Sequence, residues 1–191
     1  MNTNLVIGIC GSARAGKDTF CERAKIFLSN KKVGAARAAF ADEVKKDLDD
    51  LCRNKIGISA FTEDSKEKEI IRPLLVTYGT DVMRGMDETW WIKKLEKNLG
   101  VHQHMNLIPI VTDVRYPNEV EWIQKECNGV VVHITRKGFK PVNKEEKKNN
   151  PIIKKMADYR TIWPTFGEDN MDDADRFVRK IMNKIYKTKI K

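Results

Sequence analysis

The chain has 191 residues, of which 33% are charged and 41% hydrophobic, as is typical of one globular domain. A chain of this length buries about 70% of the surface that its unfolded form exposes, so its fold needs no disulfide staple. The four cysteines are widely spaced and form no C-x-x-C pair, which indicates buried thiols in a reducing cytoplasm. No apolar stretch reaches the length of a membrane span, so we expect a soluble cytoplasmic protein without a membrane partner.

The formal net charge of +9 at pH 7 first suggests a nucleic-acid partner. The distribution of the charge changes that interpretation, because residues 136–155 alone hold eight Lys or Arg residues against two Glu residues. This segment shows the weakest helical or strand periodicity of the chain. It can bind a polyanion, or it can close as a lid over the phosphates of a nucleotide. Charge alone leaves both interpretations open.

The first predicted elements enclose a glycine-rich loop. Residues 5–10 read Leu-Val-Ile-Gly-Ile-Cys and predict a buried strand, and Phe20, Ala24, Phe27 and Leu28 recur at helical spacing. Between them, residues 11–19 read Gly-Ser-Ala-Arg-Ala-Gly-Lys-Asp-Thr. Glycines let backbone N–H groups turn toward a phosphate, and the following helix adds unsatisfied donors and its positive dipole end. The strand, loop and helix together predict a phosphate-binding P-loop.

The end of this loop departs from the usual motif at one position. Asp18 follows Lys17 directly, where Ser or Thr is usual, and Thr19 comes next. A Gly-Lys-x-Thr ending is also found in nucleoside monophosphate kinases such as adenylate kinase, so it favours a small-molecule kinase. Asp18 is either a first-turn acid that suits the helix dipole or a group that holds water around Mg²⁺.

The rest of the chain alternates predicted strands and helices. The further strands are Val33 to Phe40, Leu107 to Thr112 and Val130 to Thr135. The helices carry Val44, Leu48, Leu51 and Cys52; Leu74, Leu75, Val82 and Met83, with a break near Gly79; Trp91, Leu95 and Leu99; Val120, Ile123 and Cys127; and Ala174, Phe177, Val178, Ile181 and Ile185. This alternation predicts an α/β fold with a parallel β-sheet flanked by helices on both faces. Together with the phosphate-binding loop it predicts a three-layer P-loop kinase fold.

A second charged group follows a core strand. The strand at 107–112 continues into Asp113-Val114-Arg115. Residues two apart in an extended segment point the same way, so Asp113 and Arg115 can converge at the sheet edge where open α/β folds bind ligands. Asp113 could contact Mg²⁺ or orient a substrate, and Arg115 could bind phosphate oxygens. The alternative is an ordinary ion pair that ends the strand.

Three blocks resemble the phage deoxynucleoside monophosphate kinase family. They are the opening Gly-x-x-x-x-Gly-Lys-Asp-Thr; residues 74–81, Leu-Leu-Val-Thr-Tyr-Gly-Thr-Asp, leading to Asp87-x-x-Trp90-Trp91; and Thr112-Asp113-Val114-Arg115 followed by Asn118-Glu119. Their order and approximate spacing agree with the family, although residues 53–70 and 137–170 match only loosely. The resemblance implies that the γ-phosphoryl group of ATP passes to a deoxynucleoside monophosphate (dNMP), with Mg²⁺, to give the diphosphate (dNDP) and ADP.

Two other functions stay open. Animal phosphomevalonate kinase also has a Gly-Lys-Asp loop and an Asp-x-Arg strand end, so a small-molecule phosphate kinase of that type is the main rival. A nucleic-acid-binding P-loop ATPase is the other, although the chain lacks a hydrophobic strand that ends in paired Asp-Glu.

The resemblance and the loop chemistry together assign site residues. The catalytic residues expected are Lys17, Arg14, Asp113 and Arg115. The ATP-binding residues are Ala15, Gly16, Lys17, Asp18, Thr19 and Arg136, and the metal ligands are Thr19 and, through water, Asp18. The acceptor-binding residues implied by the family are Lys45, Arg72, Gly79, Thr80, Trp91, Asp113, Arg115 and Glu119.

Most acceptor residues also have a structural alternative. Trp91 could belong to a helix core, Lys45 could be an exposed charge, and Arg72 could flank a helix start. Glu119 could be a first-turn acid, and Gly79 and Thr80 could form a helix break and cap.

We expect one P-loop kinase domain over residues 1–191, with a helical acceptor-binding insertion at about 41–100 and a basic lid-like segment at about 136–160. The expected partners are ATP and a deoxynucleoside monophosphate, and nucleic acid is not required. A homodimer is one assembly that we consider. The expected location is the cytoplasm, that of the host if the source is a phage.

Overall fold

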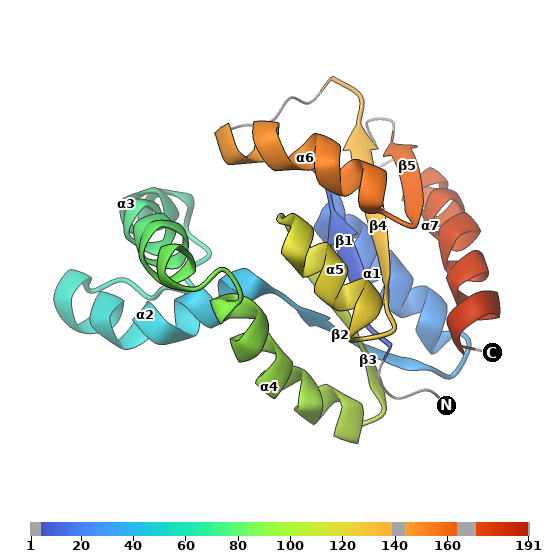
Figure 1. Cartoon of the computed structure of the whole chain (residues 1–191), viewed down its shortest axis with the longest axis horizontal. Coiled ribbons are helices and arrows are strands. Elements are labelled where there is room, and N and C mark those ends of the chain that lie inside the picture. Colours follow the sequence, from blue (N-terminus) through green and yellow to red (C-terminus); the bar gives the residue numbers. More distant parts are fainter. Residues whose placement is uncertain (1–4, 139–143, 164–170, 191) are drawn as a thin grey trace. The chain divides into compact units, whose positions relative to one another are not determined.

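The computed structural model describes residues 5–138, 144–163 and 171–190 (Figure 1). The chain forms two compact units. The first consists of Met1–Ala38 and Leu99–Lys191, and the second of Ala39–Asn98. The range of the second unit overlaps the expected insertion at 41–100, whose part in acceptor binding remains a prediction.

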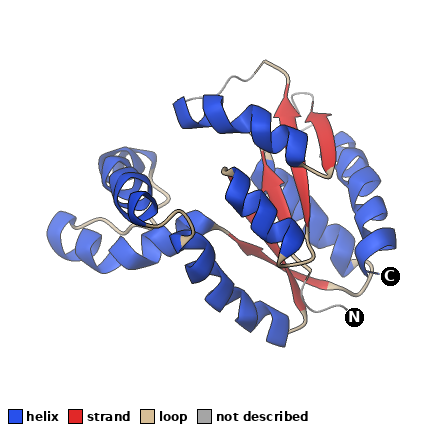
Figure 2. Cartoon of the chain, in the orientation of Figure 1, coloured by secondary structure: helices blue, strands red, loops and turns tan. Residues whose placement is uncertain are grey.

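The first unit is built on a five-stranded parallel sheet in the order β2-β3-β1-β4-β5. The strands are β1 (Ile7–Cys10), β2 (Gly34–Ala38), β3 (Leu107–Val114), β4 (Val130–Arg136) and β5 (Tyr159–Trp163), drawn red in Figure 2. The apolar β1 is central, so Ile7 pairs with Ile110 of β3 and with Val130 of β4. Parallel strands direct the loops after β1, β3 and β4 to one edge of the sheet.

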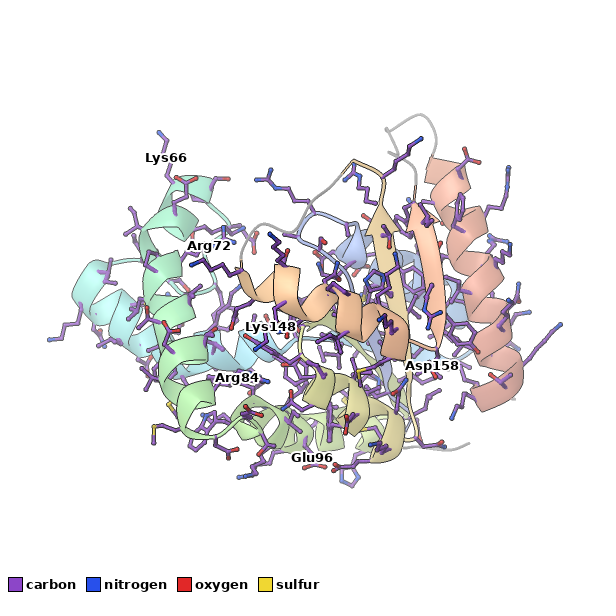
Figure 3. All side chains as sticks on the ribbon, turned by 45° about the horizontal axis from the view of Figure 1, so that its top comes forward. Lys66, Arg72, Arg84, Glu96, Lys148 and Asp158 are labelled. Atoms are coloured by element: carbon purple, nitrogen blue, oxygen red, sulfur yellow. The ribbon has the colours of Figure 1, made fainter. Side chains whose placement is uncertain are left out.

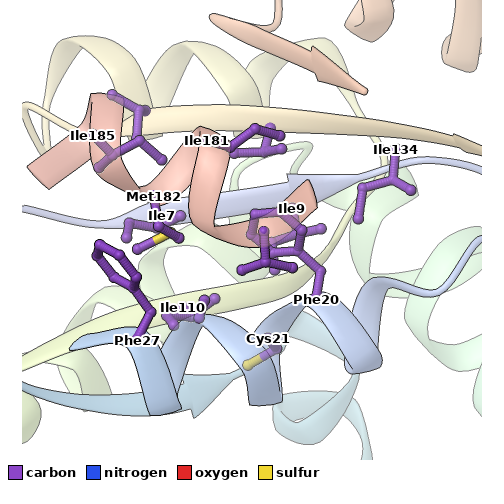
Figure 4. Close-up of a cluster of buried hydrophobic side chains, with 14 of the residues drawn as sticks. Ile7, Ile9, Phe20, Cys21, Phe27, Ile110, Ile134, Ile181, Met182 and Ile185 are labelled. Atoms are coloured by element: carbon purple, nitrogen blue, oxygen red, sulfur yellow. The ribbon is translucent and has the colours of Figure 1, made fainter. Parts of the chain in front are cut away.

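Helices cover both faces of this sheet. On one face α1 (Lys17–Ser29) and α7 (Met171–Ile185) pack their apolar side chains against β1, β3 and β4 (Figure 4). The other face is covered by α5 (Pro117–Lys125), which α6 (Lys144–Met156) packs against. Gly8 of β1 lets α5 approach, because a Cβ there would lie 2.7 Å from Cδ1 of Ile123. The predicted three-layer α/β fold is confirmed.

The second unit is helical. It contains α2 (Phe40–Ile56), α3 (Ser65–Val76), the π-helix η1 (Thr77–Arg84) and the start of α4 (Trp90–His104). The Asp64 carboxylate caps α3 by accepting hydrogen bonds from the N–H groups of Lys66 and Glu67. The core of this unit contains Leu48, Cys52 and Ala60, and Val44, Leu74, Leu75 and Tyr78 pack around it.

In the first unit, a second π-helix, η3 (Tyr186–Ile190), follows α7.

Several predicted elements differ from the structure. The helix around Gly79 does not break there, because α3 continues directly into η1. Leu51 of α2 is 46% exposed, outside the buried helix face that we predicted for it. Residues 144–156 form α6, although apolar periodicity did not predict a helix, and β5 was not predicted. The expected lid segment at 136–160 includes residues 139–143, which lie outside the described residues.

Two expectations from composition can be compared with the structure. All four cysteines are buried free thiols, as predicted. Among the described residues, no helix combines the length and the apolar character needed to cross a bilayer.

The core between α1 and the sheet supplies a stability prediction. Leu28 is fully buried, whereas Ile26 on the same helix is 49% exposed. Leu28→Ala should lower the free energy of unfolding by about 3 kcal/mol, because it removes buried apolar contacts and leaves a cavity. Ile26→Ala, the matched control, should cost less than about 1 kcal/mol. Urea titration measures both, and equal losses would show that this core does not support α1.

Candidate active site

The loop after β1 has a backbone that glycine alone can follow at its first position. Gly11 has a φ of 140°, and a Cβ there would lie 2.2 Å from the carbonyl oxygen of Ile134 in β4. Gly16 has a φ of 88°, and a Cβ there would lie 3.0 Å from the ring of Trp163 at the end of β5. The loop therefore lies tightly against the ends of two neighbouring strands, against the backbone of β4 at Gly11 and against the Trp163 side chain of β5 at Gly16.

The loop leads into α1 with its N-terminal amides uncapped by a side chain. Gly16 is the N-cap residue and provides no side-chain acceptor, while the N–H of Ala15 donates to the carbonyl of Ser12 at 3.1 Å. A helix N-terminus of this kind attracts anions through its N–H groups and its dipole. An open hollow of about 410 Å³ lies here, lined by residues 14–19 and Arg136. The structure thus brings the residues predicted to bind ATP to one hollow.

Lys17 is folded back onto the loop. Its Nζ donates to the carbonyls of Gly11 at 3.1 Å and Ser12 at 2.9 Å. Burial and the positive charge of Arg115 lower the pKa of Lys17 below its ordinary value, while Glu146, Asp18 and Asp113 act in the opposite direction. A partly desolvated cation held by carbonyls suits an anionic ligand, whose charge would favour the ammonium form.

The end of β3 brings Asp113 and Arg115 close enough to Lys17 to change its pKa. The strand carries a bulge here, because Gly8 pairs with Val111 whereas Cys10 pairs with Val114, so simple alternation does not hold through the bulge. Bulges are common beside active sites because they redirect side chains. Asp113 is half-buried and Arg115 exposed.

Glu119 acts as a cap on α5. It is 3% exposed, and its Oε2 accepts hydrogen bonds from the N–H groups of Arg115 at 2.7 Å and Tyr116 at 3.0 Å. This is the structural alternative that the sequence left open. Since Glu119 holds the backbone of Arg115, it positions the residue that was predicted to bind the acceptor.

Sequence reasoning missed the contribution of α6. Its Glu146 accepts a long hydrogen bond of 3.4 Å from the N–H of Ala13, and Nδ2 of Asn150 donates to Oγ of Ser12 at 3.2 Å. Glu146 and Asn149 are buried, while lysines such as Lys148, labelled in Figure 3, are exposed. The signal was present as polar residues at 146, 149 and 150, but a search for apolar periodicity does not detect a polar buried face.

Arg14, Arg136 and Asp18 lie at the rim of the hollow. Arg14 has a φ of 60° and is exposed, and its carbonyl accepts a hydrogen bond from Nη1 of Arg136 at 3.1 Å. Asp18 is also exposed and lies 3.9 Å from Nε of Arg37. An exposed pair at this distance contributes little to stability, so Asp18 stays available to other partners.

The remaining predicted residues lie in the second unit. Trp91 is 5% exposed, and its Nε1 donates to the carbonyl of Gly79 at 2.7 Å, as the core alternative predicted. Gly79 lies within η1, where a Cβ would come 3.2 Å from the methyl groups of Val44, so Gly79 neither breaks nor ends the helix. Thr80 is half-buried in the same π-helix.

Lys45 and Arg72 carry the positive charges predicted for acceptor binding in this unit. Nζ of Lys45 lies 5.4 Å from the centroid of the Phe61 ring, within the range of a cation–π contact. Arg72 is exposed on α3, one residue before Pro73.

The donor set suits Mg²⁺. Thr19 offers a hydroxyl and Asp18 a carboxylate in the first turn of α1, and oxygen ligands are those that Mg²⁺ prefers. This ion usually completes its shell with water and substrate phosphates, so no all-protein cage is required. Among the described residues, no group of three or more His, Cys, Asp or Glu side chains forms such a cage.

Comparisons with known proteins add family information. A sequence model of the deoxynucleotide monophosphate kinase family matches residues 22–149, which is more than half of the chain and begins just after the P-loop. No curated protein matches the sequence. Among solved structures, a shikimate kinase from Bacteroides thetaiotaomicron has 12% sequence identity and a TM-score of 0.46, with 94% of this chain and 98% of that chain covered.

The family match includes the charged end of β3 and the first part of α6, and the P-loop that precedes the match has the geometry of a phosphate site. This chain belongs to the deoxynucleotide monophosphate kinase family and is a P-loop kinase for a nucleotide or other small molecule.

Proposed function

We propose that this chain transfers the γ-phosphoryl group of ATP to a deoxynucleoside monophosphate, giving ADP and the corresponding diphosphate. One observation carries the proposal within its kinase family: the uncapped amides of α1 and the ammonium of Lys17 lie beside the charged end of β3. Backbone donors, a mobile cation and an Arg are the groups that phosphoryl transfer requires.

The loop supplies the donor site in this proposal. Lys17 binds the β- and γ-phosphates, together with the amides of residues 16–19, and Arg136 lies near the donor nucleotide. Ala15 lines the same hollow, but its N–H already donates to the carbonyl of Ser12. Exposed Arg14 reaches the bridging region between donor and acceptor. Thr19, with Asp18 through water, would hold Mg²⁺, which neutralises charge on the phosphates when bound.

The acceptor contacts in this proposal are those that the family implies. We assign Lys45, Arg72 and Thr80 to contacts with the acceptor, and likewise Asp113 and Arg115. Buried Trp91 and Glu119 act on the acceptor through the backbone groups that they bond, those of Gly79 and Arg115.

The chemistry needs alignment more than proton transfer. A phosphate oxygen of the acceptor, already ionised at neutral pH, attacks the γ-phosphorus, and the bond to the β,γ-bridging oxygen breaks to release ADP. No general base is therefore required. Lys17, Arg14 and Arg115 stabilise the charge that spreads over the transferring group, which is the largest contribution a protein makes to such a step.

The wider setting is also proposed. A kinase of this type would work in the cytoplasm, that of the host if the source is a phage, without nucleic acid, and as a monomer or a homodimer. The basic segment at about 136–160 would act as a lid over the phosphates when substrates bind, and residues 139–143 of it lie outside the described residues.

A coupled assay tests the proposal. ADP release from ATP and Mg²⁺ should depend on a deoxynucleoside monophosphate in a panel that also contains ribonucleoside monophosphates and phosphomevalonate. Turnover with phosphomevalonate alone would favour the rival kinase. Turnover that requires added DNA, with steeply salt-dependent DNA binding, would identify a nucleic-acid-driven ATPase and overturn the proposal.

A variant of Lys17 tests the role of the loop in the same assay. Lys17→Met should reduce turnover about a hundredfold or more, since one electrostatic donor to the transition state is commonly worth that factor. Lys25→Met is the matched control, because half-buried Lys25 lies on the same helix and pairs with Glu22. Near-normal turnover in a folded Lys17→Met variant would refute the assignment of this cation.

Asp113 and Arg115 supply a separate prediction. Asp113→Asn combined with Arg115→Gln should lower kcat/KM for the acceptor at least about tenfold while stability changes only modestly, because Arg115 is exposed and Asp113 is only half-buried. Arg115→Gln alone should raise the pKa of Lys17, since the Arg115 charge lowers it. NMR titration of the lysine side chain measures this shift.

Arg176→Gln, on the exposed face of α7, is the control for both measurements. A folded double variant with unchanged kinetic constants would leave only the ion-pair interpretation of Asp113 and Arg115.

A further inference from the structure

A chain of hydrogen bonds runs from β4 through α6 to the P-loop. It begins at Thr135, whose Oγ1 lies 3.3 Å from Nδ1 of His133 on the same strand. Nε2 of His133 lies 2.9 Å from Oδ1 of Asn150 on α6. Nδ2 of Asn150 then donates to Oγ of Ser12 at 3.2 Å. Three elements that are distant in sequence are thereby joined.

The direction of each bond follows from the chemistry of the amide. Because the NH₂ group of Asn150 faces Ser12, its oxygen faces His133 and accepts a hydrogen bond from Nε2–H. Nδ1 is then the acceptor for the hydroxyl of Thr135. His133 is 1% exposed and its burial lowers its pKa, so the imidazole is neutral at neutral pH and has one donor and one acceptor, as the chain requires.

The chain ends on the residue that holds the catalytic lysine. The carbonyl of Ser12 accepts hydrogen bonds from Nζ of Lys17 at 2.9 Å and from the N–H of Ala15 at 3.1 Å. Asn150 fixes the side chain of Ser12 while Lys17 and Ala15 bond its carbonyl. A shift of Ser12 would therefore move the ammonium of Lys17.

A second contact holds the next loop residue. Glu146 lies one helical turn before Asn150, on the same face of α6, and accepts a hydrogen bond from the N–H of Ala13. The helix thus holds Ser12 and Ala13, two successive residues of the loop. Because a buried polar group is costly when unpaired, buried His133 favours the arrangement of loop and helix in which half-buried Asn150 bonds it.

We propose that His133 and Asn150 are positioning residues that set the place of Ser12 and, through it, of Lys17 for phosphoryl transfer. Neither residue needs to touch the substrate. The proposal rests on the proposed function, in which the loop and Lys17 bind the phosphates of ATP. A displacement of about 1 Å in such a group can reduce turnover a hundredfold.

The first test replaces the amide by an apolar group of similar size. Asn150→Leu should lower kcat about tenfold or more and weaken ADP binding, measured by calorimetry, since Lys17 loses its fixed place. Ile153→Val, a buried change on the same helix, tests packing alone and should leave both quantities unchanged. A folded Asn150→Leu variant with normal kcat and ADP affinity would overturn the proposal.

The second test compares two amide substitutions of His133 that differ in length. The amide nitrogen of Gln can occupy the place of Nε2 and donate to Asn150, whereas that of the shorter Asn cannot. His133→Gln should therefore retain kcat within about threefold, while His133→Asn should lose it as Asn150→Leu does. A merely structural histidine would give equal kcat in both folded variants, and this outcome contradicts the proposal.

The two proposals fail in different ways. If wild-type protein shows no acceptor-dependent turnover with any phosphate acceptor, the proposed function fails, and ADP calorimetry on the same variants still measures whether the chain of bonds positions the loop.

Discussion

The close approach of Gly11 to β4 is the constraint on which the site depends. Because Gly11 has no Cβ, its backbone can lie against the carbonyl of Ile134, and the chain can turn sharply at the end of β1. The turn delivers Gly16 as a bare N-cap and starts α1 beneath the loop, where Phe20 packs on Trp163 with ring centroids 6.0 Å apart. Core packing and phosphate binding are therefore consequences of the same backbone geometry: the apolar strand and helix hold the turn, and the turn leaves N–H groups free to bind an anion.

Acidic and basic side chains both lie near the loop in the absence of a substrate. The lysines that give the basic segment its charge lie mostly on the exposed face of α6, as Lys148 does, whereas the face toward the loop carries Glu146, Asn149 and Asn150. Glu146 favours the ammonium form of Lys17 and opposes the effects of burial and of Arg115. Net charge alone thus gave a misleading picture of this helix, because the residues that contact the loop are acidic or neutral.

The sequence allowed the loop, the central strands and the charged end of β3 to be predicted, because these depend on local pattern: an apolar run, glycines at fixed spacing and a lysine. Tertiary contacts decided the rest. The helix near Gly79 continues as a π-helix packed on Val44, and α6 buries polar residues that apolar periodicity cannot detect. The edge strand β5 has Ile162 exposed and Trp163 buried under the loop, so it lacked the pattern of a core strand. Trp91 and Glu119 were identified, but only the structure showed what they bond.

Binding of ADP to a Gly11→Ala variant tests the central claim most directly. Wild-type protein should bind ADP saturably in calorimetry, and Gly11→Ala should weaken that binding at least about tenfold, because the added methyl group forces the loop away from β4. Gly57→Ala is the control, since Gly57 also has a positive φ, 75°, but has no atom within 4 Å of the added Cβ. Equal ADP affinity in wild type and folded Gly11→Ala would contradict the claim that this backbone contact builds the phosphate site.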